Sequence, residues 1–201
     1  MKPKPASTGW PSAGFEFGDR RRRPPDWTRK GSGYKSTNSA LLSFCAEVNM
    51  SNQSSHDAVK SELKRLTAEF FRAVSFEPGE APSYGSIYAL FIEGGLLIKN
   101  SGATPEISSV RQFIEPRQAS VNAGELTRFH EAELFETTEI FGNVAHRFSA
   151  YVKSGTLKGV PFEARGLIST QFVRVPAGWK MSSMAWDDER PGLRLRKQNE
   201  P

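Results

Sequence analysis

Three side chains of this sequence could move protons together if the fold brings them close. His130 and His146 lie in two segments that read as neighbouring strands, so their rings could approach each other within a sheet. Glu133 lies between them in the sequence, and a histidine beside a carboxylate forms a general acid–base pair. We therefore take His130, Glu133 and His146 as candidate catalytic residues, with ordinary sheet histidines as the alternative.

Other polar and aromatic residues fall where burial is expected and could bind the oxygen atoms of a ligand. Arg165 and Gln171 lie inside a predicted strand, where a buried polar group needs a partner. A ligand carboxylate or carbonyl would be one partner for Arg165, and a strand glutamate is the alternative. Tyr88 and Tyr151 carry phenol donors, although Tyr88 also fits the packing face of a helix. Trp186 completes these ligand-binding candidates, with a core or interface aromatic as its alternative.

Metal and cofactor motifs are not visible. The histidines are not spaced as a metal pair, and neither His-Glu-x-x-His nor Cys-x-x-Cys occurs. The acidic run at 187–189 could bind a cation, or it could be a solvated strand end. No glycine-rich phosphate loop, nucleophile elbow or dinucleotide fingerprint is present. We therefore expect neither a metal nor a cofactor.

The elements that must position these residues begin with helices. Ser54 and Asp57 have the spacing of a helix N-terminus, and apolar residues then recur at helical spacing until Pro78. Residues 84–91 repeat that spacing over a short second helix, and residues 96–100 read as a short strand. Residues 104–106 form a further helix start, with a proline at the first helical position. This third helix is expected to reach Pro116.

Strands dominate the rest of the sequence. Four long segments rich in Phe, Val, Thr, Tyr and Trp read as antiparallel hairpins: 126–140, 143–153, 162–175 and 178–186. Their alternation is interrupted at Glu131, Glu133 and Glu136. A curved sheet with helices on one face and a dimer contact on the other would explain the interruption. Helices followed by strands predict an α+β domain with the first helix lying across the sheet.

Several stretches in this order resemble the nuclear transport factor 2-like superfamily, in its bacterial SnoaL-like branch. Residues 91–95 look like the turn before its first strand, and residues 142–151 look like its Gly-x-Val-Ala strand. Arg165-Gly166 with Gln171, followed by residues 178–181, look like its last hairpin. The resemblance covers about residues 56–190. It implies a cone-shaped, cystatin-like fold, with a curved, mostly antiparallel sheet wrapped on N-terminal helices around a pocket.

The resemblance leaves the activity open, because this fold carries many functions. The family includes ketosteroid isomerase, scytalone dehydratase, polyketide cyclases, epoxide hydrolases, transport adaptors and members with no known activity. Where isomerase-like members carry an aspartate base on the first strand, this sequence has Lys99 or Asn100, and neither replaces a carboxylate. Lys99 therefore joins the ligand-binding candidates.

Three functions are compatible with these features. A small-molecule-binding domain with an apolar pocket is our leading interpretation. The first alternative is a cyclase-, isomerase- or dehydratase-type enzyme that uses the candidate histidines or Glu133 as its base, with a tyrosine or Arg165 steadying an enolate-like oxygen. The second is a dimeric protein-interaction adaptor whose core is filled.

The excess positive charge lies in the first quarter of the sequence. Residues 1–49 hold nine Lys and Arg against four Asp and Glu, whereas residues 50–201 hold eighteen of each. A neutral body argues against nucleic-acid binding by the domain. Residues 1–52 and 191–201 are expected to be disordered tails around a domain at 53–190. Met50 precedes a polar run and the first helix, so we expect it to be the true start, with residues 1–49 over-read upstream.

Location and partners can also be predicted. No run reaches the roughly 18 apolar residues of a membrane-spanning helix. The apolar stretch at 40–46 is short and late for a signal peptide. Cys45 is the one cysteine, so no intrachain disulfide is possible and a reducing cytoplasmic setting is expected. The expected partners are a hydrophobic small molecule and a second copy, in a homodimer formed through the outer sheet face, with no membrane and no nucleic acid.

Overall fold

The computed structural model describes residues 38–195, with side chains from His56 onward. The site described below lies in the compact unit that begins at Ser43. Most of the two expected tails, at 1–37 and 196–201, lies outside the described residues. Within the described part, no helix combines the length and the hydropathy that a bilayer crossing requires.

The first helix, α1, spans Asn38–Val74 and therefore begins well before the start predicted at Ser54. Residues 38–52, which were expected to be disordered, are helical. The reason lies in propensity, because Ala and Leu at 40–42 are strong helix formers and the polar run at 51–55 costs at most about 0.7 kcal/mol per residue. No glycine or proline interrupts residues 38–74, so Ser54 lies inside the helix instead of capping it.

Six strands form one sheet in the order β2-β1-β6-β5-β4-β3. Their bounds are β1 Phe91–Lys99, β2 Glu106–Ser109, β3 Leu126–Phe141, β4 Val144–Leu157, β5 Val160–Val175 and β6 Gly178–Asp188. Only the pairing of β1 with β6 is parallel. The four long strands and the mostly antiparallel sheet predicted from the sequence are confirmed.

The short segment before the sheet differs from its prediction. A 3-10 helix, η1, covers Tyr84–Ala89, and Phe91 already belongs to β1. Gly94 has a φ of 75°, and the register between β1 and β6 shifts between Phe91 and Leu96. The predicted break at Gly94 is therefore a bulge within one strand, where glycine supplies the left-handed backbone that a bulge needs.

The helix start predicted at 104–106 is wrong, because Glu106–Ser109 form β2 against β1. Helix α2 spans Val110–Asn122 and begins after Ser109. Ser109 Oγ accepts a hydrogen bond from the Gln112 amide at 3.3 Å, and Gln112 Oε1 accepts one from the Ser109 amide at 2.9 Å. This capping box replaces the predicted cap. Pro116 lies within α2 and does not end it.

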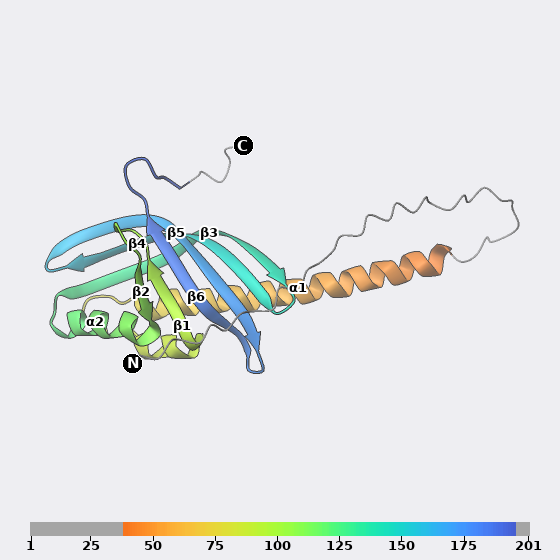
Figure 1. Ribbon diagram of the computed structural model, residues 1–201, viewed down its shortest axis with the longest axis horizontal. Coiled ribbons are helices and arrows are strands. Elements are labelled where there is room, and N and C mark those ends of the chain that lie inside the picture. The colour runs from red at the N-terminus through yellow and green to blue at the C-terminus, as the bar shows by residue number, and fades with distance from the viewer. Residues whose placement is uncertain (1–37, 196–201) are drawn as a thin grey trace, which may run out of the picture. The chain divides into compact units, whose positions relative to one another are not determined.

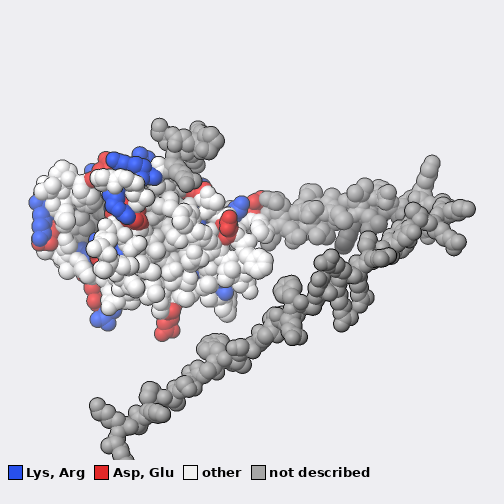
Figure 2. Space-filling view, turned by 45° about the horizontal axis from the view of Figure 1, so that its top comes forward, with Lys and Arg blue, Asp and Glu red and all other residues white. Residues whose placement is uncertain are grey.

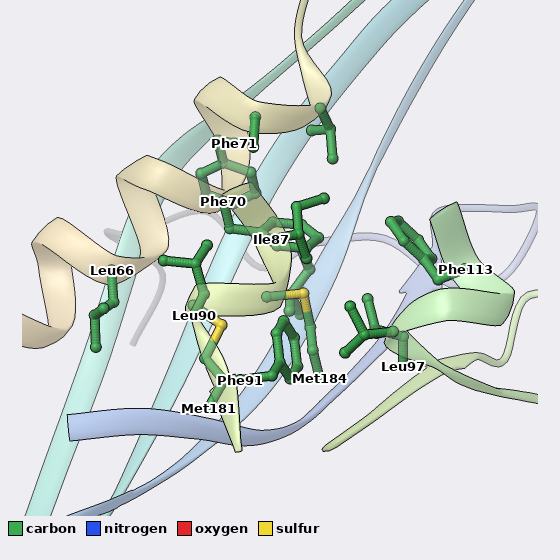
Figure 3. Close-up of a cluster of buried hydrophobic side chains, with 14 of the residues drawn as sticks. Leu66, Phe70, Phe71, Ile87, Leu90, Phe91, Leu97, Phe113, Met181 and Met184 are labelled. Atoms are coloured by element: carbon green, nitrogen blue, oxygen red, sulfur yellow. The ribbon is translucent and has the colours of Figure 1, made fainter. Parts of the chain in front are cut away.

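The helices pack on one face of the sheet, with α1 crossing behind the strands (Figure 1). Phe70 of α1 lies at the centre of this core, 6.1 Å from the ring of Phe113 in α2 and 6.4 Å from that of Phe91 in β1. Met184 of β6 closes the cluster from the sheet side (Figure 3). Burying a side chain of this size contributes about 2–3 kcal/mol, so this shared core is what holds helices and sheet together.

Charges are mixed on the face of the domain that Figure 2 shows. Lys and Arg side chains lie there among Asp and Glu, with broad uncharged areas between them. That distribution agrees with the equal numbers of acidic and basic residues counted for residues 50–201.

Candidate functional site

A pocket of about 390 Å³ opens between the helices and the sheet face that they cover. Its volume lies in the range of small-molecule sites. The apolar part of its wall consists of Phe70, Val74, Phe113, Leu126, Phe129, Leu157, Phe162, Ile168, Met184 and Trp186. The polar part consists of Tyr84, Lys99, Glu106, Arg117, Glu131 and Lys153. A few polar groups within an aromatic wall are the usual composition of a ligand site.

Strand alternation brings the β3 and β4 residues of the pocket together. Phe129 and Glu131 lie two positions apart on β3, so they share the face that the helices cover. Glu131 pairs with Lys153 of β4 in the register of the hairpin. The Glu131 amide also donates to Ser75 Oγ at 3.0 Å, which ties this point of β3 to the end of α1.

Glu131 supplies a carboxyl group with an unusually high pKa. Among the described residues its carboxylate makes no ion pair and no hydrogen bond. Burial raises the pKa of Glu131 to about 7, although the charges of Lys153 and Arg117 act to lower it. Near neutral pH the group therefore exists in both protonation states, which is what a general acid–base group requires.

Arg117 lies on α2 beside the aromatic wall. Its Nη1 donates to the Phe113 carbonyl at 2.8 Å, and its guanidinium carbon lies 3.6 Å from the centroid of the Phe113 ring. Burial lowers the pKa of Arg117, while the nearby Tyr84 and Glu131 oppose that shift. The guanidinium remains charged at any ordinary pH, so it places a cation inside the pocket.

Tyr84 and Lys153 are the other donors of the pocket. Burial raises the pKa of the Tyr84 phenol, which therefore stays protonated and can donate a hydrogen bond. Lys153 Nζ lies 2.7 Å from Asp188 Oδ1, and the Tyr151 hydroxyl donates to the same oxygen. Burial acts to raise the pKa of Asp188, but hydrogen bonds from Lys153 and Tyr151 outweigh it and lower the pKa. Asp188 is thus held as a carboxylate that fixes Lys153.

Two of the predicted ligand-binding residues line the pocket. Trp186 packs edge-on against Phe113, with ring centroids 6.1 Å apart, and Lys99 forms an ion pair of 3.1 Å with Glu106. Tyr151 is buried next to the pocket and reaches it through Asp188 and Lys153.

The other three predicted ligand-binding residues are exposed and lie outside the pocket. On β5 the side chains of Ile168 and Phe172 are buried, so the odd-numbered Arg165 and Gln171 project from the opposite face. Tyr88 is 50% exposed, next to Ile87, which is buried. Strand register, which the sequence leaves unassigned, decides which of these side chains reach a ligand.

The predicted catalytic residues do not line the pocket and do not come together. His130 of β3 lies opposite Ser154, whereas His146 of β4 lies opposite Glu139, so the histidines are at different ends of the β3–β4 hairpin. His130 is exposed, and His146 Nε2 lies 3.0 Å from Ser169 Oγ.

Glu133 is bound by Arg147, with Nε–Oε1 at 3.0 Å and Nη2–Oε2 at 2.7 Å. Its carboxylate is therefore occupied by an ion pair and is not free to act as a base. The carboxylate that faces the pocket is instead the one two residues earlier, Glu131.

Sequence reasoning missed Glu131, Arg117 and Lys153 as site residues, although a signal for each existed. Arg117 follows Phe113 by four residues and therefore lies on the apolar face of its helix. Glu131 alternates with Phe129 on the buried face of its strand, and Lys153 alternates with Tyr151. Helical spacing or strand alternation assigns each of these charged residues to the buried face. A charge in such a position needs a bound ligand or an ion pair to stabilise it, so it marks a possible site.

Comparison with known proteins gives likenesses of fold alone. No family model and no curated protein matches the sequence. A nuclear transport factor 2-like superfamily protein from Salmonella enterica serovar Typhimurium is 13% identical, with a TM-score of 0.56 over 73% of this chain and 99% of that one. An NTF2-like protein with a cystatin-like fold from Novosphingobium aromaticivorans is 16% identical, with a TM-score of 0.54 over 70% and 88%. A protein from Kribbella flavida is 14% identical, with a TM-score of 0.55 over 67% of this chain and 93% of that one.

The described domain therefore has the nuclear transport factor 2-like, cystatin-like fold that its sequence motifs predicted.

Proposed function

We propose that the domain binds a small hydrophobic molecule in this pocket and that Glu131 transfers a proton to and from it. The observation that carries the proposal is the Glu131 carboxyl, which lies within an aromatic wall without a protein partner among the described residues. A general base works best when its pKa lies near the working pH. Neutral pH is where Glu131 is half ionised.

The proposed chemistry is proton removal from carbon next to a carbonyl group. The ionised Glu131 takes the proton, and the electrons of the C–H bond move to the carbonyl oxygen to give an enolate. The Tyr84 hydroxyl donates a hydrogen bond to that oxygen, which stabilises the charge as it develops. The protonated Glu131 then returns its proton to a second carbon, or to a leaving hydroxyl group, giving an isomerase or a dehydratase.

The base of this scheme comes from β3. Lys99, which stands where isomerase-like relatives carry an aspartate, is paired with Glu106 and can only orient a ligand. The SnoaL-like branch and the cytoplasmic location stay predictions from the sequence.

The test uses 5-nitrobenzisoxazole, a flat aromatic compound whose ring opens when a base removes one carbon-bound proton. The full chain should accelerate the opening with a pH midpoint near 7, and Glu131→Gln should reduce the acceleration by about 100-fold. Glu139→Gln is the matched control, because Glu139 lies exposed on the same strand. An unchanged rate in Glu131→Gln rules out the proposed base.

A second proposal concerns the outer face of the sheet, where we infer a contact with a second copy. Phe148 and Leu134 are 41% and 42% exposed there, beside a hollow of about 480 Å³ lined by Phe135, Phe148 and Leu167. Exposed apolar clusters of this kind are typical of subunit contacts. Sedimentation equilibrium should show a dimer that Phe148→Glu converts to a monomer and that Val160→Glu, at a hairpin end, leaves intact. A monomeric wild-type chain would contradict the proposal.

A further inference from the structure

The cations of the pocket are not equally compensated. Lys99 is paired with Glu106 at 3.1 Å, and Lys153 is paired with Asp188 at 2.7 Å. Within residues 56–195, Arg117 has no carboxylate at ion-pair distance. Its one hydrogen bond uses Nη1, so Nε and Nη2 have no protein acceptor among these residues. The arrangement leaves a charged, donor-rich group facing the pocket.

Glu131 compensates this charge only in part. Its field acts on Arg117, but burial raises the pKa of Glu131 to about 7, so near neutrality about half of the molecules carry no charge there. A partly buried cation without a full counter-charge is destabilised relative to the same cation in water. An anion that enters the pocket would remove that cost.

We infer that the pocket takes a ligand with a carboxylate on a flat apolar body, and that Arg117 binds the carboxylate. The inference deepens the proposed function, since it rests on the same pocket and names the class of molecule. A guanidinium presents parallel N–H groups that match the two oxygens of a carboxylate. The aromatic rings of Phe113, Phe129 and Trp186 supply flat walls for the body of the ligand.

Binding of such an anion should be coupled to a proton. The charged and titratable groups around Glu131 are Arg117 of α2, Lys153 of β4 and Asp188 of β6, with Tyr84 of η1 beside Arg117. A bound carboxylate adds negative charge near Glu131 and so raises its pKa further. Binding near pH 7 should therefore take up a proton, and affinity should fall as the pH rises above 7.

The experiment compares 2-naphthoate with 2-naphthamide, its uncharged analogue, by titration calorimetry on the full chain at pH 6 and pH 8. We expect the carboxylate to bind about ten-fold more tightly than the amide at pH 6, and the preference to shrink at pH 8. Arg117→Gln should abolish the preference by weakening 2-naphthoate alone. Arg111→Gln on the same helix, where Arg111 is exposed and paired with Glu115, should keep it.

Either of two results overturns the inference: equal affinity for the two probes in the wild-type chain, or no binding of 2-naphthoate at millimolar concentration. Should Arg117→Gln fail to fold by circular dichroism, Arg117→Lys is used instead. It keeps the charge without the planar fork, and should keep a preference reduced by a few-fold. The uncharged 5-nitrobenzisoxazole separates the proposals, because Glu131-dependent ring opening without a carboxylate preference removes only this inference. A carboxylate preference without ring opening removes only the proposed base.

Discussion

Arg147 and Glu133 form a bidentate ion pair across the β3–β4 hairpin, with contacts of 3.0 Å and 2.7 Å. The Arg147 side chain is 1% exposed, and its Nη1 also lies 3.0 Å from Glu136. The pair lies on the helix-covered side of the sheet, where Thr138 Oγ1 accepts a further hydrogen bond from Arg147. The sequence had made Glu133 a candidate base because it lies between two histidines, and the ion pair assigns it a structural role instead.

Removing Glu133 should therefore destabilise the domain without changing pocket chemistry. Glu133→Ala leaves a buried guanidinium with Glu136 as its remaining counter-charge, which should cost about 2–3 kcal/mol of unfolding free energy. Urea unfolding measures this, with Glu139→Ala on the same strand as the control. If Glu133→Ala lowers the proton-transfer rate while stability is unchanged, the residue has a catalytic role after all.

Substitution of Gly166 should be poorly tolerated. A Cβ at this position would lie 2.2 Å from the Asp187 carbonyl oxygen and 2.5 Å from the Tyr151 hydroxyl. Gly166→Ala must therefore displace the tyrosine that holds Asp188, at a cost of about 1–3 kcal/mol. Thermal unfolding checks the loss. Gly85→Ala is the control, since a Cβ there meets nothing within 4 Å. Equal melting temperatures of the two variants would contradict the packing described for Tyr151.

The raised pKa of Glu131 predicts a pH dependence of stability with a definite sign. The folded chain holds its proton from the ordinary value of 4.5 up to about 7, whereas the unfolded chain has released it. The stability contribution is thus fully present below pH 4.5 and is lost as the pH rises through 7. A shift of this size corresponds to about 3 kcal/mol. Glu131→Gln should therefore become more stable relative to the wild type between pH 5 and pH 8, as measured by urea unfolding. A constant difference would show that the carboxyl is already ionised at pH 5.

The capping box of α2 gives a prediction that is independent of the pocket. Ser109→Ala removes the acceptor for the Gln112 amide and should cost about 1 kcal/mol. Ser109→Gly should cost less, because glycine is itself an acceptable N-cap residue. Denaturant midpoints of the two variants test this order. The reverse order would mean that the serine contributes through packing.

The sequence was sufficient for the long strands and for two of their turns, because β-branched and aromatic runs were separated by Gly142 and by Pro176. It was insufficient at Glu106, where a short strand and a helix start share the same residue types. Only pairing with β1 decides for the strand. The site was harder still. The bulge that shifts the β3–β4 register between Glu133 and Phe135 cannot be seen in the sequence, and such shifts decide which side chains face the ligand.

The pocket wall draws on Phe70 at the end of the first helix and on Trp186 in the last strand. A molecule held there touches both ends of the domain at once and acts as a non-covalent cross-link. Partial opening of one hairpin would not release the bound molecule. A bound ligand should therefore slow global unfolding and digestion by proteases more than it slows local fraying. Resistance to proteolysis is thus a way to search extracts for the natural ligand without any assumption about its chemistry.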